Sequence, residues 1–428
     1  MSRLLIKNGR VVDPSQKLDE GLDVLVVDGK IARIAERITD KDAQVVDATG
    51  LVVAPGFIDV HVHLREPGYE YKETIETGSQ AAAAGGFTAV CCMPNTNPVN
   101  DNPAVTEYIL ARAREAAAAR VYPIGAISKG LAGEELAEIG EMVRAGAVAF
   151  SDDGKPVVSS YLMRRAMEYS LLFDVPIVDH CEEPTLSARG VMHEGAVATR
   201  LGLRGIPAAA EEVMVWRNVI LAQLTGARVH IAHLSTAGSL EAVRQAKAKG
   251  LRVSCEVTPH HLTLTDQAVA ESNYDTNTKM NPPLRSAEHV EALVEGVLDG
   301  TVDCLATDHA PHHWDEKSVE FDKAPFGIVG LETALPLTFD LLVVKHRMPL
   351  SRFVACWSTN PARLFRLPGG TLKVGAPADI TVFDPELRAV VNPEKFRSRS
   401  RNTPFAGKRL RGWPVMTVVG GKVVYRRG

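Results

Sequence analysis

Hydrophobic and polar positions follow two different patterns along this chain. Both ends consist of short, β-branched runs with turn signals such as Asn8-Gly9 and Asp28-Gly29, which favour antiparallel strands. From about residue 56 to residue 367, short apolar runs alternate instead with alanine-rich or amphipathic stretches of helical period. Strands that alternate with helices in this way indicate a parallel sheet.

The middle region contains enough strand–helix units for a closed (β/α)8 barrel of the TIM type. Strands are predicted at 57–63, 87–93, 121–127, 147–151, 175–180, 228–233, 252–257 and 302–307. An open, doubly wound sheet is the alternative, but no strand is followed by a glycine-rich phosphate loop. Neither end has enough strands for a stable sheet, so both ends are expected to combine into one small β-sandwich. The predicted division is 1–55 and 368–428 for the sandwich and 56–367 for the barrel.

Composition adds limits on the class of protein. The chain has 428 residues, 45% of them hydrophobic, enough for one large core and a smaller one. A net charge of −4 gives no electrostatic case for binding nucleic acid, and no apolar run is long enough for a bilayer or a signal peptide. The six cysteines lie mostly within apolar runs, as expected for reduced thiols in the cytoplasm.

The first barrel strand carries the most informative stretch, Phe57-Ile58-Asp59-Val60-His61-Val62-His63-Leu64-Arg65. Side chains alternate along an extended chain, so His61 and His63 point to the same face. Two imidazoles side by side at a strand end can bind a borderline metal such as Zn²⁺. A single pair with this spacing also occurs on ordinary half-buried strands, so the other strand ends decide between the two interpretations.

Polar residues fall at the C-terminal ends of most of the predicted strands, where barrel enzymes carry their chemistry. These residues are His61, His63 and Arg65; Asn95; Asp152 and Asp153; His180; His233; Thr258 and His260; and Asp308 and His312. Apolar strands that end in histidine or aspartate are hard to explain as core packing. The set exceeds what one tetrahedral metal needs, so two metals that share a carboxylate are the economical interpretation.

Several of these segments resemble motifs of the cyclic amidohydrolase superfamily, most closely those of the bacterial type I dihydroorotases. The matching segments are 55–68 (PGFIDVHVHLREPG), 93–96 (MPNT), 150–154 (FSDDG), 180–182 (HCE), 233–236 (HLST), 280–285 (MNPPLR) and 306–312 (ATDHAPH). They span the predicted barrel, and the β-rich ends fit the composite sandwich of that family.

The resemblance implies two Zn²⁺ ions and six ligands: His61, His63 and Asp308 for one ion, His180 and His233 for the other, and Asp153 as the bridge. Many relatives use a carboxylated lysine as the bridge, whereas this chain offers Asp152-Asp153 there. Only one of two adjacent strand residues can face inward. The type I pattern favours Asp153, and Asp152 or a modified Lys155 are the alternatives.

By the same resemblance, the expected reaction is the reversible cyclisation of N-carbamoyl-L-aspartate to L-dihydroorotate in pyrimidine biosynthesis, with Asp308 as general acid and base. The expected substrate-binding residues are His63, Leu64, Arg65, Asn95, Asn281, His312 and the backbone of Phe326-Gly327. Arg65 also has an argument of its own, because a guanidinium fork matches a carboxylate; a salt bridge at the barrel rim is the alternative.

Two other functions are compatible with parts of this pattern. A dihydropyrimidinase or allantoinase would share the fold, but these enzymes usually carry the lysine bridge and their substrates lack the carboxylate of dihydroorotate. A non-catalytic scaffold for aspartate transcarbamoylase would have lost metal ligands, and every expected ligand is present. We expect a homo-oligomer, with association with aspartate transcarbamoylase as a further option.

Two segments remain open at this stage. The polar stretch 311–327 is either a lid over the barrel mouth or a crossing loop. The basic stretches 397–401 and 408–411 are expected to form a solvated face or a protein contact, given the acidic net charge of the chain.

Overall fold

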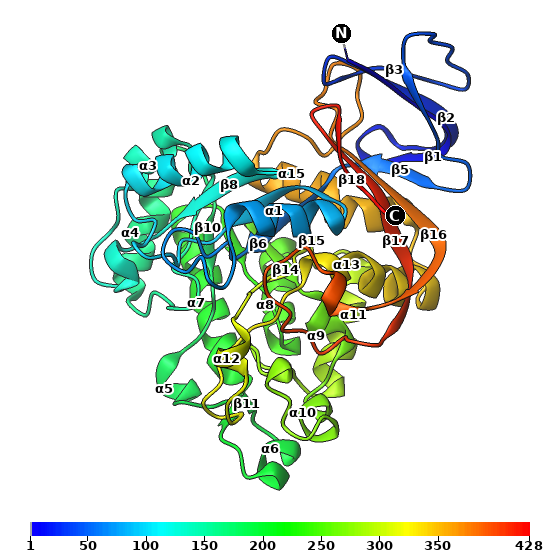
Figure 1. Ribbon diagram of the computed structural model, residues 1–428. Helices are drawn as coiled ribbons and strands as arrows, with labels where there is room; N and C mark the ends of the chain where they lie inside the picture. Colours follow the sequence, from blue (N-terminus) through cyan, green and yellow to red (C-terminus); the bar gives the residue numbers. More distant parts are fainter. Residues whose placement is uncertain (1) are drawn as a thin grey trace.

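The computed structural model describes residues 2–428 and contains a parallel eight-stranded barrel surrounded by helices (Figure 1). The strands are hydrogen-bonded in the order β15-β14-β13-β10-β9-β8-β7-β6. Their bounds are β6 (Phe57–Val62), β7 (Phe87–Cys92), β8 (Arg120–Gly125), β9 (Ala149–Phe150), β10 (Ile177–Asp179), β13 (Val229–Ile231), β14 (Val253–Val257) and β15 (Cys304–Leu305). All eight predicted strands are confirmed, although most end before the predicted residue.

At two strand ends the backbone of a polar residue leaves the extended conformation. His233 and Asp308 have left-handed backbones, with φ of 29° and 49°, which extended strands do not allow. The barrel is closed just beyond β15, where Val62 forms a parallel bridge with His309. The side chain of Asp59 accepts hydrogen bonds from the backbone of both His61 and Thr307, so the first and last strand ends are held together.

Helices cover the outside of the barrel and create two buried layers. The main helices are α1 (Ile75–Ala84), α2 (Pro103–Ala116), α3 (Ile139–Ala145), α4 (Ser160–Ser170), α7 (Ala209–Thr225), α8 (Ala237–Ala248), α11 (Ala287–Asp299) and α13 (Leu331–Thr338). Cys91 packs in the inner cluster with Ile58 and Val60, whereas Cys92 packs in the outer cluster with the helices. Adjacent residues of β7 therefore face opposite layers, and both cysteines are part of the core packing.

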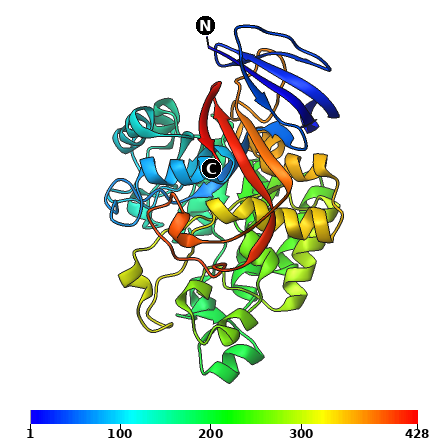
Figure 2. The same cartoon turned by 45° about the vertical axis from the view of Figure 1, so that its right-hand side comes forward.

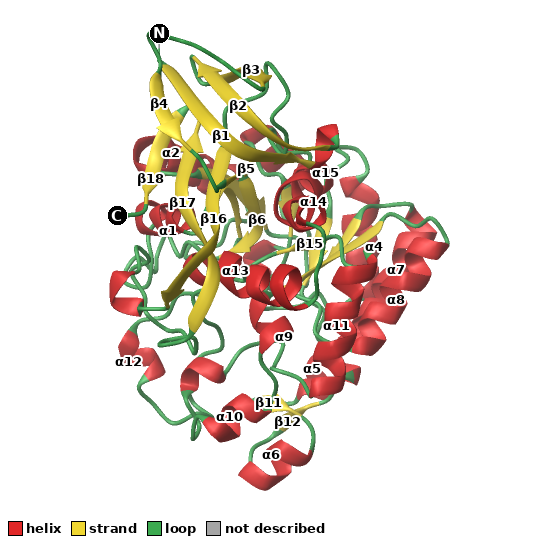
Figure 3. Cartoon of the chain, turned by 90° about the vertical axis from the view of Figure 1, so that its right-hand side faces the viewer, coloured by secondary structure: helices red, strands yellow, loops and turns green. Residues whose placement is uncertain are grey.

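Smaller elements gather at the barrel end that lies away from the terminal sheet (Figures 1 and 3). They are α5 (Pro184–Ser187), β11 (Met192–His193), α6 (Ala196–Leu201), β12 (Gly205–Ile206), α9 (Pro259–Thr263), α10 (Gln267–Glu271) and α12 (Trp314–Lys317). These elements follow the C-terminal ends of the strands and surround the mouth of the barrel.

The two ends of the chain build one module together, as predicted (Figure 2). Its strands are β1 (Arg3–Asp13), β2 (Leu18–Val27), β3 (Lys30–Ala35), β4 (Gln44–Asp47), β5 (Val52–Pro55), β16 (Ile380–Val390), β17 (Arg409–Val419) and β18 (Lys422–Arg426). Hydrogen bonds link all eight strands, and the antiparallel pair β5–β16 joins the two ends. The module has its own core, separate from the barrel, with Ile6, Val24 and Val418 among its members. The domain boundaries at 55/56 and 367/368 stay a prediction.

Within residues 2–428, no helix is both long and apolar enough to cross a membrane.

Candidate metal centre

Six buried side chains meet at the C-terminal end of the barrel, and all six were predicted as metal ligands. They are His61, His63, Asp153, His180, His233 and Asp308. One group consists of His61, His63 and Asp153, and another of Asp153, His180 and His233; within each group the possible ligand atoms lie within 4.8 Å of one another. Asp153 belongs to both groups, which is the arrangement a bridging ligand requires.

Two carboxylates, Asp153 and Asp308, lie beside His61 and His63, and Asp308 also forms a group with His61 and His233. His63 Nε2 lies 3.1 Å from Asp308 Oδ1 and 3.5 Å from Asp153 Oδ2. His61 Nε2 lies 3.4 Å from Asp153 Oδ1 and 3.5 Å from Asp308 Oδ1. Both imidazoles therefore direct the same nitrogen, Nε2, toward the space between the two aspartates.

The second group brings two imidazole nitrogens face to face. His180 Nδ1 lies 2.8 Å from His233 Nε2, and the two nitrogens lie 3.8 and 3.6 Å from Asp153 Oδ1. The other nitrogen of His180, Nε2, lies 3.0 Å from Glu182 Oε2. Glu182 can accept the ring proton, which leaves Nδ1 of His180 free to bind a cation beside His233.

Asp152 faces the opposite side from Asp153. Its carboxylate accepts hydrogen bonds from the backbone N–H of Ile127 (2.8 Å) and Ser128 (3.0 Å) and from the Ser128 hydroxyl. These contacts hold the end of β8. The side chains thus support the choice of Asp153, rather than Asp152, as the shared ligand.

Two further partners of the predicted ligands, Glu256 and Asn95, orient the imidazoles. Glu256 accepts from His61 Nδ1 at 2.7 Å and lies 3.1 Å from His230 Nε2. Asn95 Oδ1 accepts from His63 Nδ1 at 2.9 Å. Sequence reasoning missed the roles of Glu256, His230 and Glu182. A charged residue within the apolar strand 253–257 was the available signal for Glu256.

The electrostatics of the cluster favour added positive charge. Burial disfavours the imidazolium of His180, but the carboxylates of Glu182 and Asp153 outweigh it and raise its pKa to about 9. Burial likewise opposes the charged form of Asp153, yet the surrounding imidazoles, His61 first, hold its pKa well below its ordinary value. A site that raises the proton affinity of its own histidine also attracts a metal cation.

Buried polar atoms without partners point to the same conclusion. Among the described residues, His61 Nε2, Asp153 Oδ1 and His233 Nδ1 are buried and form no hydrogen bond. Such atoms cost free energy unless they gain a partner. Two of them, His61 Nε2 and Asp153 Oδ1, face the centre of the cluster, and imidazole and carboxylate donors suit Zn²⁺. The residues present therefore fit a pair of divalent ions.

Arg65 stands at the barrel mouth, two residues beyond His63. Its backbone is left-handed, with φ of 61°, and its Nε donates to the carbonyl oxygen of Pro311 at 3.2 Å. Burial lowers the pKa of its guanidinium. No carboxylate within residues 2–428 forms an ion pair with it, which leaves a partly buried cation available to an anionic ligand.

His312 and the Phe326-Gly327 backbone form the adjoining wall. His312 Nε2 donates to the carbonyl oxygen of Phe326 at 2.8 Å, and its Nδ1 has no hydrogen-bond partner among the described residues. Burial and the nearby Arg65 hold the pKa of His312 well below its ordinary value. Gly327 has φ of 114°, and a Cβ there would lie 2.6 Å from Ala310 Cβ, so the close approach requires glycine.

The other predicted substrate residues take different positions. Asn281 Nδ2 donates to Glu182 Oε2 at 2.6 Å, next to His180. The side chain of Leu64 is buried in the outer core and packs against α1 at Gly78, so only its backbone can face a substrate. The stretch 311–327 contains the short helix α12, and Lys317 ties it down by donating to the carbonyl oxygens of Thr276 and Pro325.

Comparisons with known proteins cover the whole chain. A family model described as dihydro-orotase-like matches residues 50–239. The dihydroorotase of Syntrophotalea carbinolica is 56% identical over 424 residues, 99% of this chain and 99% of that protein. The dihydroorotase of Pelotomaculum thermopropionicum is 57% identical over 422 residues, 99% of this chain and 98% of that protein. Among solved structures, L-hydantoinase (dihydropyrimidinase) from Arthrobacter aurescens superposes with a TM-score of 0.90 at 29% identity, covering 100% of this chain and 97% of the other. The similarity therefore includes both the barrel and the terminal sheet.

Proposed function

Since this chain belongs to the dihydroorotase family, as its motifs predicted, we propose that its six clustered side chains hold two Zn²⁺ ions for the chemistry of that family. The activity is that of a dihydroorotase, the reversible ring closure of N-carbamoyl-L-aspartate to L-dihydroorotate. In the proposed assignment His61, His63 and Asp308 hold one ion, His180 and His233 the other, and Asp153 both. Bound zinc would polarise the scissile carbonyl and acidify a water molecule.

Asp308 is the proposed proton carrier. Its Oδ1 lies 3.5 Å from His61 Nε2 and 3.1 Å from His63 Nε2. Burial opposes its charged form, but the neighbouring imidazoles, His61 first, keep its pKa below its ordinary value, so it is available as a base. In hydrolysis it takes a proton from the attacking water and returns it to the departing ring nitrogen; in ring closure the same transfers run backwards.

The substrate carboxylate is proposed to bind Arg65, with Asn95 and His312 beside it. The observation that carries this proposal is the partly buried Arg65 guanidinium with no carboxylate paired to it in the described chain. A carboxylate next to His312 would favour its imidazolium, whose Nδ1 could then donate. Asn281 and the Phe326-Gly327 backbone are proposed to line the ring, because Asn281 Nδ2 lies 3.3 Å from His180 Nε2 and the Phe326 carbonyl oxygen accepts from His312.

The competing assignment is a dihydropyrimidinase, the name given to the structural neighbour from Arthrobacter aurescens. It fits this chain less well, because the shared ligand is Asp153 rather than lysine and because a neutral ring would leave Arg65 unpaired. Turnover of dihydroorotate, N-carbamoylaspartate, dihydrouracil and allantoin should be compared, with zinc measured on the same samples.

Asp308→Asn should lose about 10²–10⁴-fold in turnover of the preferred substrate. Near-normal turnover by that variant at normal zinc content would show that another group moves the proton.

Assembly and compartment complete the proposal. All six cysteines are free and buried, which supports a reducing compartment such as the cytoplasm. We further propose a homodimer as the simplest closed assembly, to be checked by light scattering at micromolar concentration. Association with aspartate transcarbamoylase rests on the family resemblance, and a native pull-down tests it.

A further inference from the structure

A short segment from the C-terminal part of the chain lies against the barrel mouth. We name residues 397–402 (Arg-Ser-Arg-Ser-Arg-Asn) the strap; it connects β16 to β17. Its three arginines are exposed, whereas Ser398, Ser400 and Asn402 are buried. The sequence predicted a solvated face or a protein contact; the arginines are exposed, and the alternate residues face the protein. The buried residues of the strap therefore have structural partners in the barrel.

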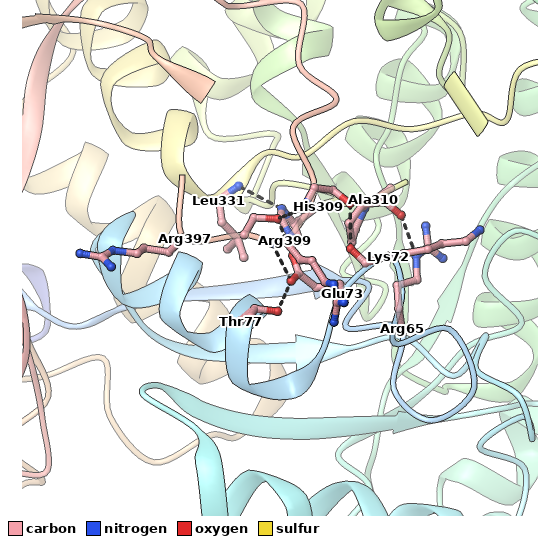
Figure 4. A network of polar contacts seen from close by, with 12 residues as sticks. Arg65, Lys72, Glu73, Thr77, His309, Ala310, Leu331, Arg397 and Arg399 are labelled. Atoms are coloured by element: carbon pink, nitrogen blue, oxygen red, sulfur yellow. Dashed lines mark hydrogen bonds and ion pairs between the residues drawn. The ribbon is translucent and has the colours of Figure 1, made fainter. Parts of the chain in front are cut away.

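The first half of the strap is anchored on α1 and its approach (Figure 4). Glu73, fully buried, accepts hydrogen bonds from the Ser398 hydroxyl and from the Arg399 backbone N–H at 3.0 Å. Its other partners are the Thr77 hydroxyl and His309 Nε2, the latter at 3.3 Å. Ser400 adds a bond from its hydroxyl to the carbonyl oxygen of Lys72 at 2.7 Å. This end of the strap is thus fixed by a buried charge.

The second half ends in Asn402, which joins the two ends of the stretch 311–327 at the mouth. Asn402 Oδ1 accepts from the backbone N–H of His312 at 3.2 Å. Its Nδ2 donates to the carbonyl oxygens of Ala310 at 3.0 Å and Gly327 at 3.1 Å. Its own carbonyl oxygen accepts from the N–H of Val329 at 2.9 Å. Both polar atoms of the Asn402 side chain therefore form hydrogen bonds, and their partners lie in the segments that carry His312 and Gly327.

These bonds matter because little regular structure otherwise joins the two ends of the stretch 311–327. The parallel bridge between His309 and Ile328 and the bond from the Ala310 N–H to the Ile328 carbonyl oxygen connect them one step earlier. Beyond that point, His312 Nε2 contacts Phe326, Lys317 donates to the carbonyl oxygen of Pro325, and Asn402 adds bonds to both sides. Without the amide of Asn402, the carbonyls of Ala310 and Gly327 would lose their donor and the N–H of His312 its acceptor.

We propose that Asn402 is a positioning residue for substrate recognition: it sets the distance between His312 and the Phe326-Gly327 backbone. This inference rests on the proposed substrate pocket. It makes the C-terminal part of the chain a structural component of the barrel's substrate site, although the barrel strands end about 95 residues earlier. Asn402 acts through His312 and Gly327 and does not itself contact the metal cluster.

The test compares dihydroorotate with dihydrouracil in Asn402→Ala and Asn402→Asp. The aspartate variant keeps the volume and the acceptor but loses both donors, which separates hydrogen bonding from packing. Leaving buried polar groups unpaired costs ~1–3 kcal/mol, so the preference for dihydroorotate should fall by about 5–150-fold in both variants. The loss should appear mainly as a higher KM, with zinc content unchanged. Asn392→Ala is the matched control, because Asn392 is exposed and its side chain bonds only Glu394 in the same part of the chain.

Two further variants decide how the result is attributed. If Asn402 acts through His312, Asn402→Ala should add less than about twofold to the loss caused by His312→Ala, as expected for coupled residues. Arg65→Met, assayed alongside, reports on the substrate pocket itself. The inference is overturned if Asn402→Ala keeps the wild-type preference, if Asn402→Asp does so, or if the effects of Asn402 and His312 are independent. A retained preference in Arg65→Met instead counts against the proposed pocket.

Discussion

His61 Nδ1 lies 2.7 Å from Glu256 Oε1, so Glu256 determines which ring nitrogen His61 offers to a metal. The same oxygen accepts from the backbone N–H of His233 at 3.3 Å. One fully buried carboxylate therefore contacts a ligand of each proposed zinc position. Its second oxygen lies 3.1 Å from His230 Nε2, and His230 Nδ1 lies 2.8 Å from the Ser254 hydroxyl. Burial opposes its charge, but the imidazoles, His61 first, lower the pKa of Glu256 to about 2.

This contact predicts that Glu256 controls metal affinity. Glu256→Leu removes the acceptor for His61, and loss of such a partner typically weakens metal binding by about 10–100-fold. Glu256→Gln keeps an oxygen for the His61 N–H and removes the charge, so it should weaken binding less. Competition with a chelator measures both dissociation constants. Asp13→Asn, a buried carboxylate in the terminal sheet, is the control. Wild-type zinc affinity in Glu256→Leu would contradict the prediction.

The neighbouring aspartates should separate metal binding from stability. Asp153→Asn weakens the ligand shared by both groups and should lower the zinc content of folded protein. Asp152→Asn should keep the zinc content, because its carboxylate faces Ile127 and Ser128 instead. Disturbing those buried bonds should lower the free energy of unfolding by ~1–3 kcal/mol. Metal analysis and urea unfolding on the same preparations give both results. The opposite pattern would make Asp152 the ligand.

Much of this site could be predicted because its signals are local. The alternation of side chains placed His61 and His63 on one face, and the ends of apolar strands located His180, His233 and Asp308. The C-terminal end of β13 was overestimated because His233 has a left-handed backbone, and no local pattern in the sequence predicts a left-handed histidine.

The supporting contacts were harder to predict because they join distant parts of the chain. Glu256 reaches His61 across 195 residues, and Asn402 reaches Ala310 across 92. Neither separation leaves a periodic trace in the sequence. The strap shows this most clearly: its arginines dominate the composition, whereas its buried serines and asparagine make the contacts.

Lys317 predicts how stability depends on pH. Burial lowers the pKa of its ammonium from 10.5 to about 7. Between these two values the unfolded chain holds a proton that the folded chain does not, so this group makes the free energy of unfolding rise with pH. A full proton corresponds to ~1.4 kcal/mol per pH unit. Lys317→Met should flatten the rise between about pH 7 and 10 relative to wild type. Urea unfolding across that range measures it, and equal slopes would show that Lys317 stays charged in the folded protein.

The central claim is that this site recognises the carboxylate of dihydroorotate through Arg65, and the preference for dihydroorotate over dihydrouracil tests it most directly. The two substrates differ by that one group, and an arginine left unpaired under a neutral ring carries a desolvation penalty. Wild type should prefer dihydroorotate by about 10³-fold or more, since sites built around a polar group reject analogues that lack it. Arg65→Met keeps the apolar stem and should remove most of that preference at unchanged zinc content. A mutant that still selects dihydroorotate as strongly as wild type would contradict the account.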